Sequence, residues 1–267
     1  MTVANSTIKK TAKDSLKNNK VKAFIVGIIL LFVVLINSNI CSFVYEIFGK
    51  TIFYFALIVL NILLLGPVAL GGVRYYWRML CGVCDDPISA FFYFSSMENY
   101  KKAMNVIFRL GVKSLIYLFL YNIPYIVLSV VLNAEFYEFL NIPIPLWTAN
   151  LSNIAMFLKS IGIVATIVSM LKYYLTPMLI VVDENMDVSE AFHMSVVISK
   201  STTLDFIFLI FSMLGWILLS LLFIPLIFTL GYFITVYLSH CSYAINDYNE
   251  HIKTLNGQDS STFVAGI

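Results

Sequence analysis

Apolar residues occur in long runs along most of the chain, and short polar or basic stretches separate these runs. Runs of roughly 20 apolar residues are typical of transmembrane helices. The pattern predicts an all-α, polytopic membrane helix bundle with six spans. We place these spans at residues 23–44, 51–73, 105–132, 159–182, 205–223 and 226–245.

Polar tails flank this membrane domain, which covers residues 23–245. The tail at 1–22 carries six lysines, whereas the predicted outer loop at 133–150 has no Lys or Arg. Because cytoplasmic segments are enriched in basic residues, we predict that both termini, including the tail at 246–267, are cytoplasmic. The basic tail is either a topology anchor or a contact with anionic lipid.

Each predicted cytoplasmic segment contains a short amphipathic helix suited to the membrane surface. In segment 74–104, Asp86 precedes a proline and is expected to cap the helix. In segment 183–203, Asp187 and Glu190 form a variant of the capping box.

Two spans are interrupted by proline. Gly66-Pro67 lies within the second span and Thr176-Pro177 within the fourth. A proline removes one helical hydrogen bond, and in lipid the freed carbonyl must find a donor inside the protein.

These interruptions, with the similar stretches at 86–92 and 186–192, indicate a parallel internal repeat. Its units are about residues 51–132 and 159–225. Chance similarity in a chain rich in Phe and Ser is the alternative.

Lys172 lies within the fourth span, roughly 16 Å from its Asp183 end at 1.5 Å per residue. A charge at such a depth suggests a functional site. The alternative is a structural pair with Asp205, or hydrogen bonds to Asn61, Asn122 or freed carbonyls. The functional interpretation predicts a ligand-binding site between spans two and four, formed by Lys172, Tyr173, Thr176, Pro177, Asn61, Gly66, Pro67 and Arg74.

Composition limits the class of protein further. The chain is 60% hydrophobic and 12% charged, with a mean hydropathy of +0.88, so it is too apolar for a soluble domain. A net charge of +2 argues against a nucleic-acid partner. The expected partners are the lipid bilayer and either another membrane protein or a bound lipid.

Catalytic motifs are not found. The spacing Glu190-x-x-His193 makes these two residues weak metal candidates, but a second such motif is missing, and a solvated acidic helix end is the simpler interpretation. Cys81-x-x-Cys84 is either packing or half of a metal or redox site. The sequence contains no P-loop, zinc-protease or serine-hydrolase motif, so we predict no enzyme and no cofactor.

Several stretches carry a family resemblance. They are Gly66-Pro-Val-Ala-Leu-Gly-Gly-Val-Arg-Tyr-Tyr76, Tyr173-Tyr-Leu-Thr-Pro177 leading to Asp183, Glu190-Ala191 with Ser195, and Gly215-Trp216. Over about residues 20–250 the chain resembles an uncharacterised bacterial integral-membrane family catalogued as domain of unknown function 975. Related membrane domains resemble those fused to some glycerophosphodiester phosphodiesterases. The resemblance implies a bacterial cell membrane location and no established reaction.

Three functions remain open on these grounds. The first is a non-enzymatic membrane protein that assists a partner system in peptide or bacteriocin export, immunity or envelope maintenance. The second is a small transporter or lipid-handling protein with a midplane site near Lys172. The third is an interfacial enzyme that uses the polar cluster at 183–193.

Overall fold

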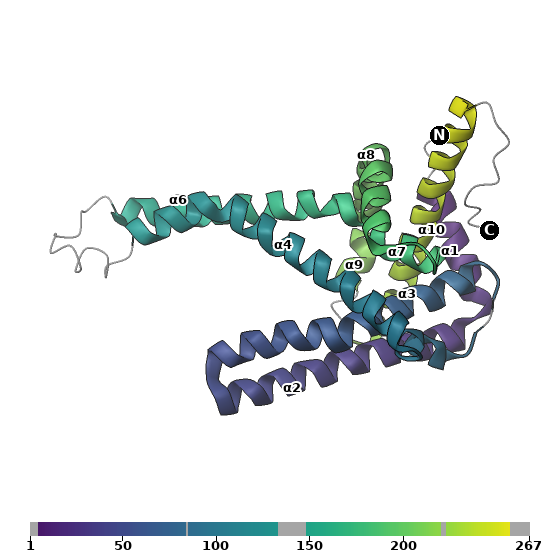
Figure 1. Cartoon of the computed structure of the whole chain (residues 1–267), viewed down its shortest axis with the longest axis horizontal. Coiled ribbons are helices and arrows are strands. Elements are labelled where there is room, and N and C mark those ends of the chain that lie inside the picture. The colour runs from purple at the N-terminus through teal and green to yellow at the C-terminus, as the bar shows by residue number, and fades with distance from the viewer. Residues whose placement is uncertain (1–4, 84, 133–147, 220–222, 257–267) are drawn as a thin grey trace. The chain divides into compact units, whose positions relative to one another are not determined.

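The computed structural model describes residues 5–83, 85–132, 148–219 and 223–256 (Figure 1). Every regular element in these ranges is a helix, so the all-helical prediction is confirmed. Four helical segments are long and apolar enough to cross a membrane, at Lys20–Leu80, Met97–Val131, Leu151–Val182 and Val188–Ser212. The apolar helices indicate a lipid bilayer environment. The chain forms two compact units, residues 109–173 and the remainder, which we describe separately.

The first unit contains a helical hairpin. Helix α2 (Lys20–Leu60) is interrupted at Gly49, whose φ of +78° is a left-handed conformation that favours glycine. The chain reverses direction there (Figure 1), which confirms the turn expected between the first two spans. Each leg exceeds the roughly 20 residues that a bilayer requires.

The second leg is irregular where proline was expected to interrupt it. The π-helical turn η1 (Asn61–Leu65) leads into α3 (Gly66–Leu80), with Pro67 in its first turn. Since Pro67 has no N–H, the carbonyl of Leu63 loses its helical donor. The Tyr100 hydroxyl donates to this carbonyl over 2.9 Å, which confirms that the freed group is satisfied inside the protein.

The fourth predicted span is interrupted in the same way. Helix α6 (Thr148–Met170) gives way to the 3-10 turn η3 (Leu171–Tyr173), and α7 (Thr176–Val182) then begins with Pro177 in its first turn. The carbonyl of Tyr174 accepts a hydrogen bond from the Tyr237 hydroxyl.

A 3-10 helix, η2 (Pro87–Phe94), packs closely on α3. A Cβ atom at Gly71 would lie only 1.8 Å from the carbonyl oxygen of Ala90, so glycine is what allows the two backbones to approach. A short helix is therefore present where the sequence predicts one. The predicted cap is not, because Asp86 stands just before η2 without a side-chain hydrogen bond to it.

Helix α8 (Val188–Ser212) corrects another expectation. Asp187 caps it as predicted, accepting from the Ser189 N–H over 2.8 Å. The sequence suggested a separate surface helix followed by a span, but α8 runs through both without a break. Within it, the hydroxyls of Thr202 and Thr203 donate to carbonyls one turn earlier, so these polar groups are satisfied inside the helix.

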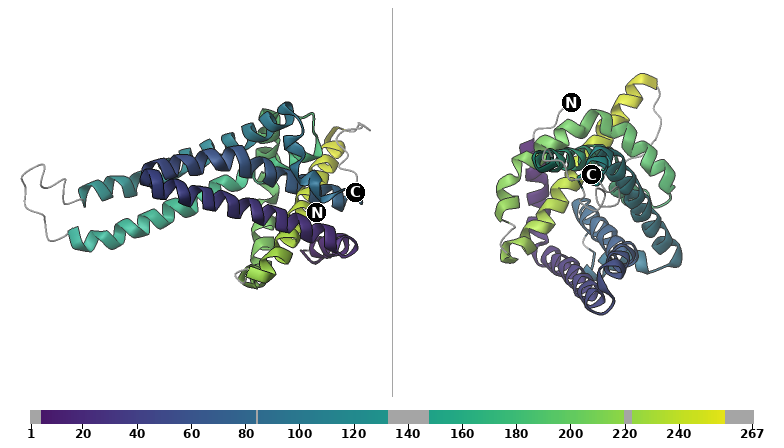
Figure 2. Two further views of the ribbon diagram at one scale, coloured as in Figure 1. Left: turned by 90° about the horizontal axis from the view of Figure 1, so that it is seen from below. Right: turned by 90° about the vertical axis from the view of Figure 1, so that its left-hand side faces the viewer.

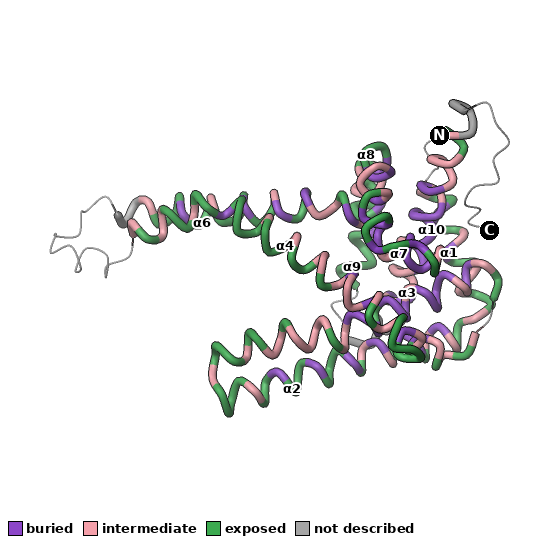
Figure 3. The backbone as a smooth tube through the Cα atoms, in the orientation of Figure 1, coloured by how far each residue is buried: buried purple, intermediate pink, exposed green. Residues whose placement is uncertain are grey.

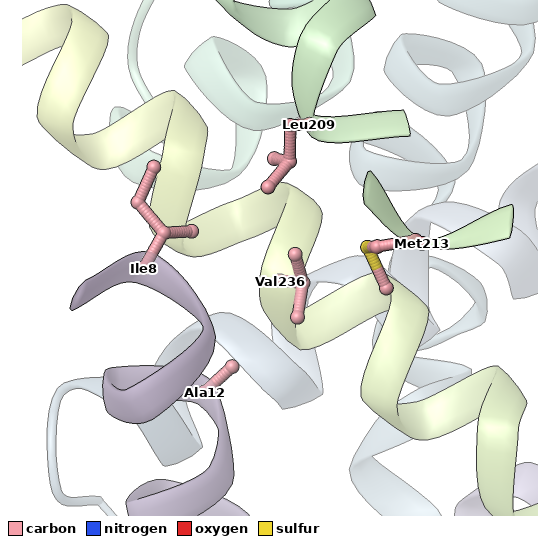
Figure 4. Close-up of a cluster of buried hydrophobic side chains, with 5 residues drawn as sticks. All are labelled: Ile8, Ala12, Leu209, Met213 and Val236. Atoms are coloured by element: carbon pink, nitrogen blue, oxygen red, sulfur yellow. The ribbon is translucent and has the colours of Figure 1, made fainter. Parts of the chain in front are cut away.

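Both polar tails contain helix. The basic tail forms α1 (Asn5–Asn18), and α10 (Phe223–Asn256) continues well past residue 245, so the C-terminal tail is helical as far as Asn256. Ile8 and Ala12 of α1 pack against Leu209 of α8, Met213 just after α8, and Val236 of α10 (Figure 4). The spacing of Ile8, Ala12 and Leu16 is the sequence signal for this helix.

Helices α8 and α10 run across the direction of the α2–α3 hairpin rather than along it (Figures 1 and 2). Between them lies the short helix α9 (Leu214–Leu219). Buried residues of the first unit gather where α3, α7 and α10 meet, whereas the hairpin legs are largely exposed (Figure 3). Exposed apolar legs are suited to contact with lipid.

The second unit is also a helical hairpin. It pairs the later part of α4 (Met97–Val131), which contains Pro124, with α6 and η3. A Cβ atom at Gly162 would lie 2.6 Å from the side-chain oxygen of Asn122, so the two helices approach closely there. Most of the predicted outer loop at 133–150, including Pro143, Pro145 and Trp147, lies outside the described residues.

We expect Gly71→Ala to lower the melting temperature of the purified protein in detergent. The new methyl group would meet a backbone oxygen, which cannot rotate away, and overpacking costs about 1–3 kcal/mol. Gly111→Ala is the matched control, because a Cβ there meets nothing within 4 Å. Equal melting temperatures for Gly71→Ala and the unaltered chain would contradict the close approach of α3 and η2.

Candidate functional site

Arg74 of α3 is the centre of a charged junction in the first unit. Its Nε lies 2.8 Å from Glu184 Oε1, and its guanidinium carbon lies 3.6 Å from the centre of the Phe92 ring. The Arg74 side chain is 11% exposed, and that of Glu184 is 50% exposed. A largely buried charge thus has both an ionic partner and an aromatic face.

Two further side chains complete this Arg74 junction. Lys102 donates to the backbone carbonyl of Glu184. Tyr93 of η2 is 2% exposed, and its hydroxyl has no hydrogen-bond partner among the described residues. Burial, together with the negative charge of Glu184, raises the pKa of Tyr93, so its hydroxyl stays protonated. The junction ties α3, η2, α4 and the α7–α8 connection together.

A second polar group occupies the hairpin of the other unit. Lys113, Tyr117 and Tyr121 follow one another at one-turn spacing on α4. Tyr173 lies against the first two, with its hydroxyl 3.4 Å from Lys113 Nζ and 3.3 Å from the Tyr117 hydroxyl. Tyr121 pairs with Ser169 over 2.8 Å. We call these five residues the tyrosine ladder.

The predicted ligand-binding residues are divided between the two units. Lys172 and Tyr173 belong to the hairpin at 109–173, and Tyr173 is part of the ladder. The other six belong to the first unit, where α7 packs on α3.

Those six residues are buried, packed or hydrogen-bonded within the first unit. Asn61 accepts a hydrogen bond from Asn37 over 3.4 Å and donates to Leu57 O over 2.7 Å. Thr176 is fully buried, and its hydroxyl has no partner among the described residues. A Cβ atom at Gly66 would lie only 2.6 Å from Ile107 Cγ1, so the two residues are in close contact. Pro67 and Pro177 lie in the first turns of α3 and α7. Arg74 is held in the junction described above.

Sequence reasoning missed a stacked group around His240. The Tyr174 hydroxyl lies 2.8 Å from Thr202 Oγ1 and 3.3 Å from His240 Nε2. The rings of Tyr174, Phe206 and His240 stack with centroids 4.3 to 5.9 Å apart. The residues that contact His240 in this group are all distant from it in sequence, so no local motif predicts the group.

The weak metal candidates are not brought into a cluster. Glu190 and His193 are both exposed on α8. Across the described ranges, no group of three or more His, Cys, Asp or Glu side chains is placed to hold a metal ion. Burial raises the pKa of Cys81, which favours its thiol form, and Cys84 lies outside the described residues.

Comparison with known proteins gives one match. Residues 1–253 match the family described as "Protein of unknown function (DUF975)". No curated protein and no solved structure matches the chain.

We expect Glu184→Gln to destabilise the protein by about 1 kcal/mol, because Arg74 would keep its aromatic contact but lose its ionic partner. The partial exposure of Glu184 limits the effect. Chemical denaturation of the purified protein measures it. Glu250→Gln removes the same charge from an exposed position on α10 and should change stability by less than about 0.5 kcal/mol. Equal effects of both variants would show that the junction contributes nothing.

Proposed function

Because the chain belongs to the DUF975 family of proteins of unknown function, we propose a function from its own geometry. We propose a non-enzymatic integral membrane protein of the bacterial cell membrane that assists a membrane partner system. Peptide or bacteriocin export, immunity and envelope maintenance are the classes of system that fit. Both termini are cytoplasmic in this proposal.

The observation that carries the proposal is the two-faced segment η2. Its inner side chains, Ala90 and Tyr93, are buried against α3. Its outer apolar side chains are exposed, with Ile88 77% exposed, Phe91 37%, Phe94 41%, and the following Met97 68%. An apolar face held at a predicted membrane surface is suited to a membrane-embedded partner.

The surrounding contacts support docking by making this segment rigid. Gly71 admits the backbone of η2 against α3, and Arg74 stacks on the Phe92 ring. A partner that binds a fixed face loses less conformational freedom than one that must order it first.

The number of spans is part of the proposal. The sequence predicts six, with α8 and α10 contributing the last two. We favour four crossings, namely the two legs of α2–α3, then α4, and then α6 with α7. In this arrangement α8, α9 and α10 lie along the cytoplasmic surface. Support comes from their direction across the α2–α3 hairpin (Figure 2) and from their packing against lysine-rich α1.

An internal repeat of residues 51–132 and 159–225 stays a prediction that two features support. Each predicted unit contains an irregular turn followed by a helix that starts with proline, at Pro67 and at Pro177. In each, a backbone carbonyl beside the break accepts a hydrogen bond from a tyrosine hydroxyl.

The alternative function is a small transporter or lipid-handling protein with a midplane site near Lys172. The tyrosine ladder favours it, because Lys113 and several hydroxyls lie side by side in an apolar hairpin, and Tyr173 of the ladder is next to Lys172 in sequence. Such groups are suited to an anionic ligand. The partner proposal ranks first because the ladder hydroxyls already bond to one another.

A photo-reactive residue in place of Ile88 is expected to cross-link to one discrete protein in intact cells. The same probe in place of Phe119, an exposed apolar residue of α4 (65%), should cross-link only to lipid. Mass spectrometry of the adducts distinguishes these results. Lipid adducts alone at Ile88 would contradict the partner proposal, and enriched lipid adducts at Tyr121 would favour the alternative.

A topology experiment tests the surface position of α8–α10. In a cysteine-free background, we expect Leu219→Cys to be inaccessible to a membrane-impermeant maleimide in intact cells and labelled after permeabilisation. Lys50→Cys, beside the turn at Gly49, should be labelled in intact cells. External labelling of Leu219→Cys would instead favour six spans.

A further inference from the structure

A cavity of about 980 Å³ lies between α1, the start of α2, and helices α9 and α10, all within the first unit. One side carries charged side chains from α1 and α2. The other carries Trp216 and Tyr232, whose rings pack 5.5 Å apart.

The charge on this cavity is strongly positive. Four lysines and one aspartate line it, an excess of three positive charges if all five are ionised. At 100° per residue, Lys10, Lys13 and Lys17 fall within an arc of about 60° on α1. Like charges held this close repel one another, and a bound anion would reduce that repulsion.

The orientation of the lysines is fixed by the opposite side of α1. Ile8 and Ala12 are almost fully buried against α8 and α10 (Figure 4). Lys9 Nζ donates to the carbonyl of Ser212 over 2.8 Å, which satisfies a carbonyl at the end of α8. A helix attached at both places cannot turn its lysines away from the cavity.

Charge also determines the depth of the cavity in the membrane. A lysine at the bilayer centre costs about 2.5–3.5 kcal/mol, so a helix with four of them lies outside the hydrocarbon. The parts of α8 and α10 that pack on Ile8 and Ala12 must then lie near headgroup depth. Tryptophan and tyrosine are enriched at this depth.

The cavity combines features that a free anion does not need. Its volume is at the upper end of small-molecule sites. Beside the lysines it offers Leu16, Ala23 and Phe24, as well as the exposed part of Trp216. Lysines suit a phosphate, and the adjacent apolar surface suits the first segments of acyl chains.

We propose that this cavity binds the phosphate group of an anionic phospholipid, with Lys10, Lys13, Lys17 and Lys20 around the headgroup. The inference rests on the surface position of α8–α10 proposed above. It is separate from the partner function, and the following binding experiment does not depend on topology.

The test is native mass spectrometry of the full chain in neutral detergent, titrated with phosphatidylglycerol or phosphatidylcholine. We expect one phosphatidylglycerol to bind at least tenfold more tightly than phosphatidylcholine. The variant Lys10→Gln, Lys13→Gln, Lys17→Gln should lose this difference. The control variant Lys50→Gln, Lys101→Gln, Lys200→Gln removes equal charge outside the cavity and should bind within twofold of the unaltered chain.

Two further measurements separate a built site from general attraction. Trp216→Ala leaves the charge unchanged and should weaken phosphatidylglycerol several-fold, and thermal unfolding checks that each variant is folded. Inorganic phosphate at millimolar concentration should not displace the lipid. Equal losses in the two triple variants would overturn the proposal, and displacement by inorganic phosphate would overturn the assignment to lipid.

Discussion

A carbonyl that proline frees inside a membrane helix must find a donor within the protein, because lipid offers none. Pro67 frees the carbonyl of Leu63, four residues earlier, and the Tyr100 hydroxyl donates to that carbonyl. At the second break the Tyr237 hydroxyl donates to the carbonyl of Tyr174, which lies in the turn before Pro177. Each donor comes from a different helix, so each break both redirects its own segment and fixes a neighbour.

The short helices that follow these breaks build the centre of the first unit. Helices α3 and α7 pack against each other, and η2 lies on α3 where Gly71 removes the steric obstacle. This arrangement brings Arg74 to Glu184, which is far from it in sequence. The ion pair depends on the breaks, since it joins the middle of α3 to the connection that follows α7. We regard the Arg74 junction as a consequence of the breaks. The junction in turn holds η2 in place, because Arg74 stacks on the Phe92 ring.

The sequence predicted the features that depend on local chemistry. Apolar runs indicated membrane helices, prolines indicated the breaks, and Asp187 indicated the start of α8. It failed where the outcome depends on distant contacts. No pattern near Arg74 specifies Glu184, and nothing near His240 specifies Tyr174. The helix α1 had a local signal in the spacing of Ile8 and Ala12, but the dense lysines around them directed the interpretation to membrane topology and lipid contact instead.

Under the proposed arrangement of four crossings, the last two predicted spans illustrate that hydropathy alone does not determine a membrane crossing. Hydropathy measures how apolar a helix is. By that measure α8 is apolar enough to cross a membrane, although it is the least apolar of the four segments. Hydropathy says nothing of what packs on the helix. Leu209 of α8 and Val236 of α10 pack in one cluster with Ile8, which directly precedes Lys9 and Lys10 in a basic helix. Moving this cluster to the bilayer centre would take several lysines with it, at about 2.5–3.5 kcal/mol each. Leaving α8 at the surface exposes some apolar side chains, which the headgroup boundary still partly covers. In the four-crossing arrangement that we propose, the cost of burying the lysines is what keeps the helices packed on α1 near the membrane surface.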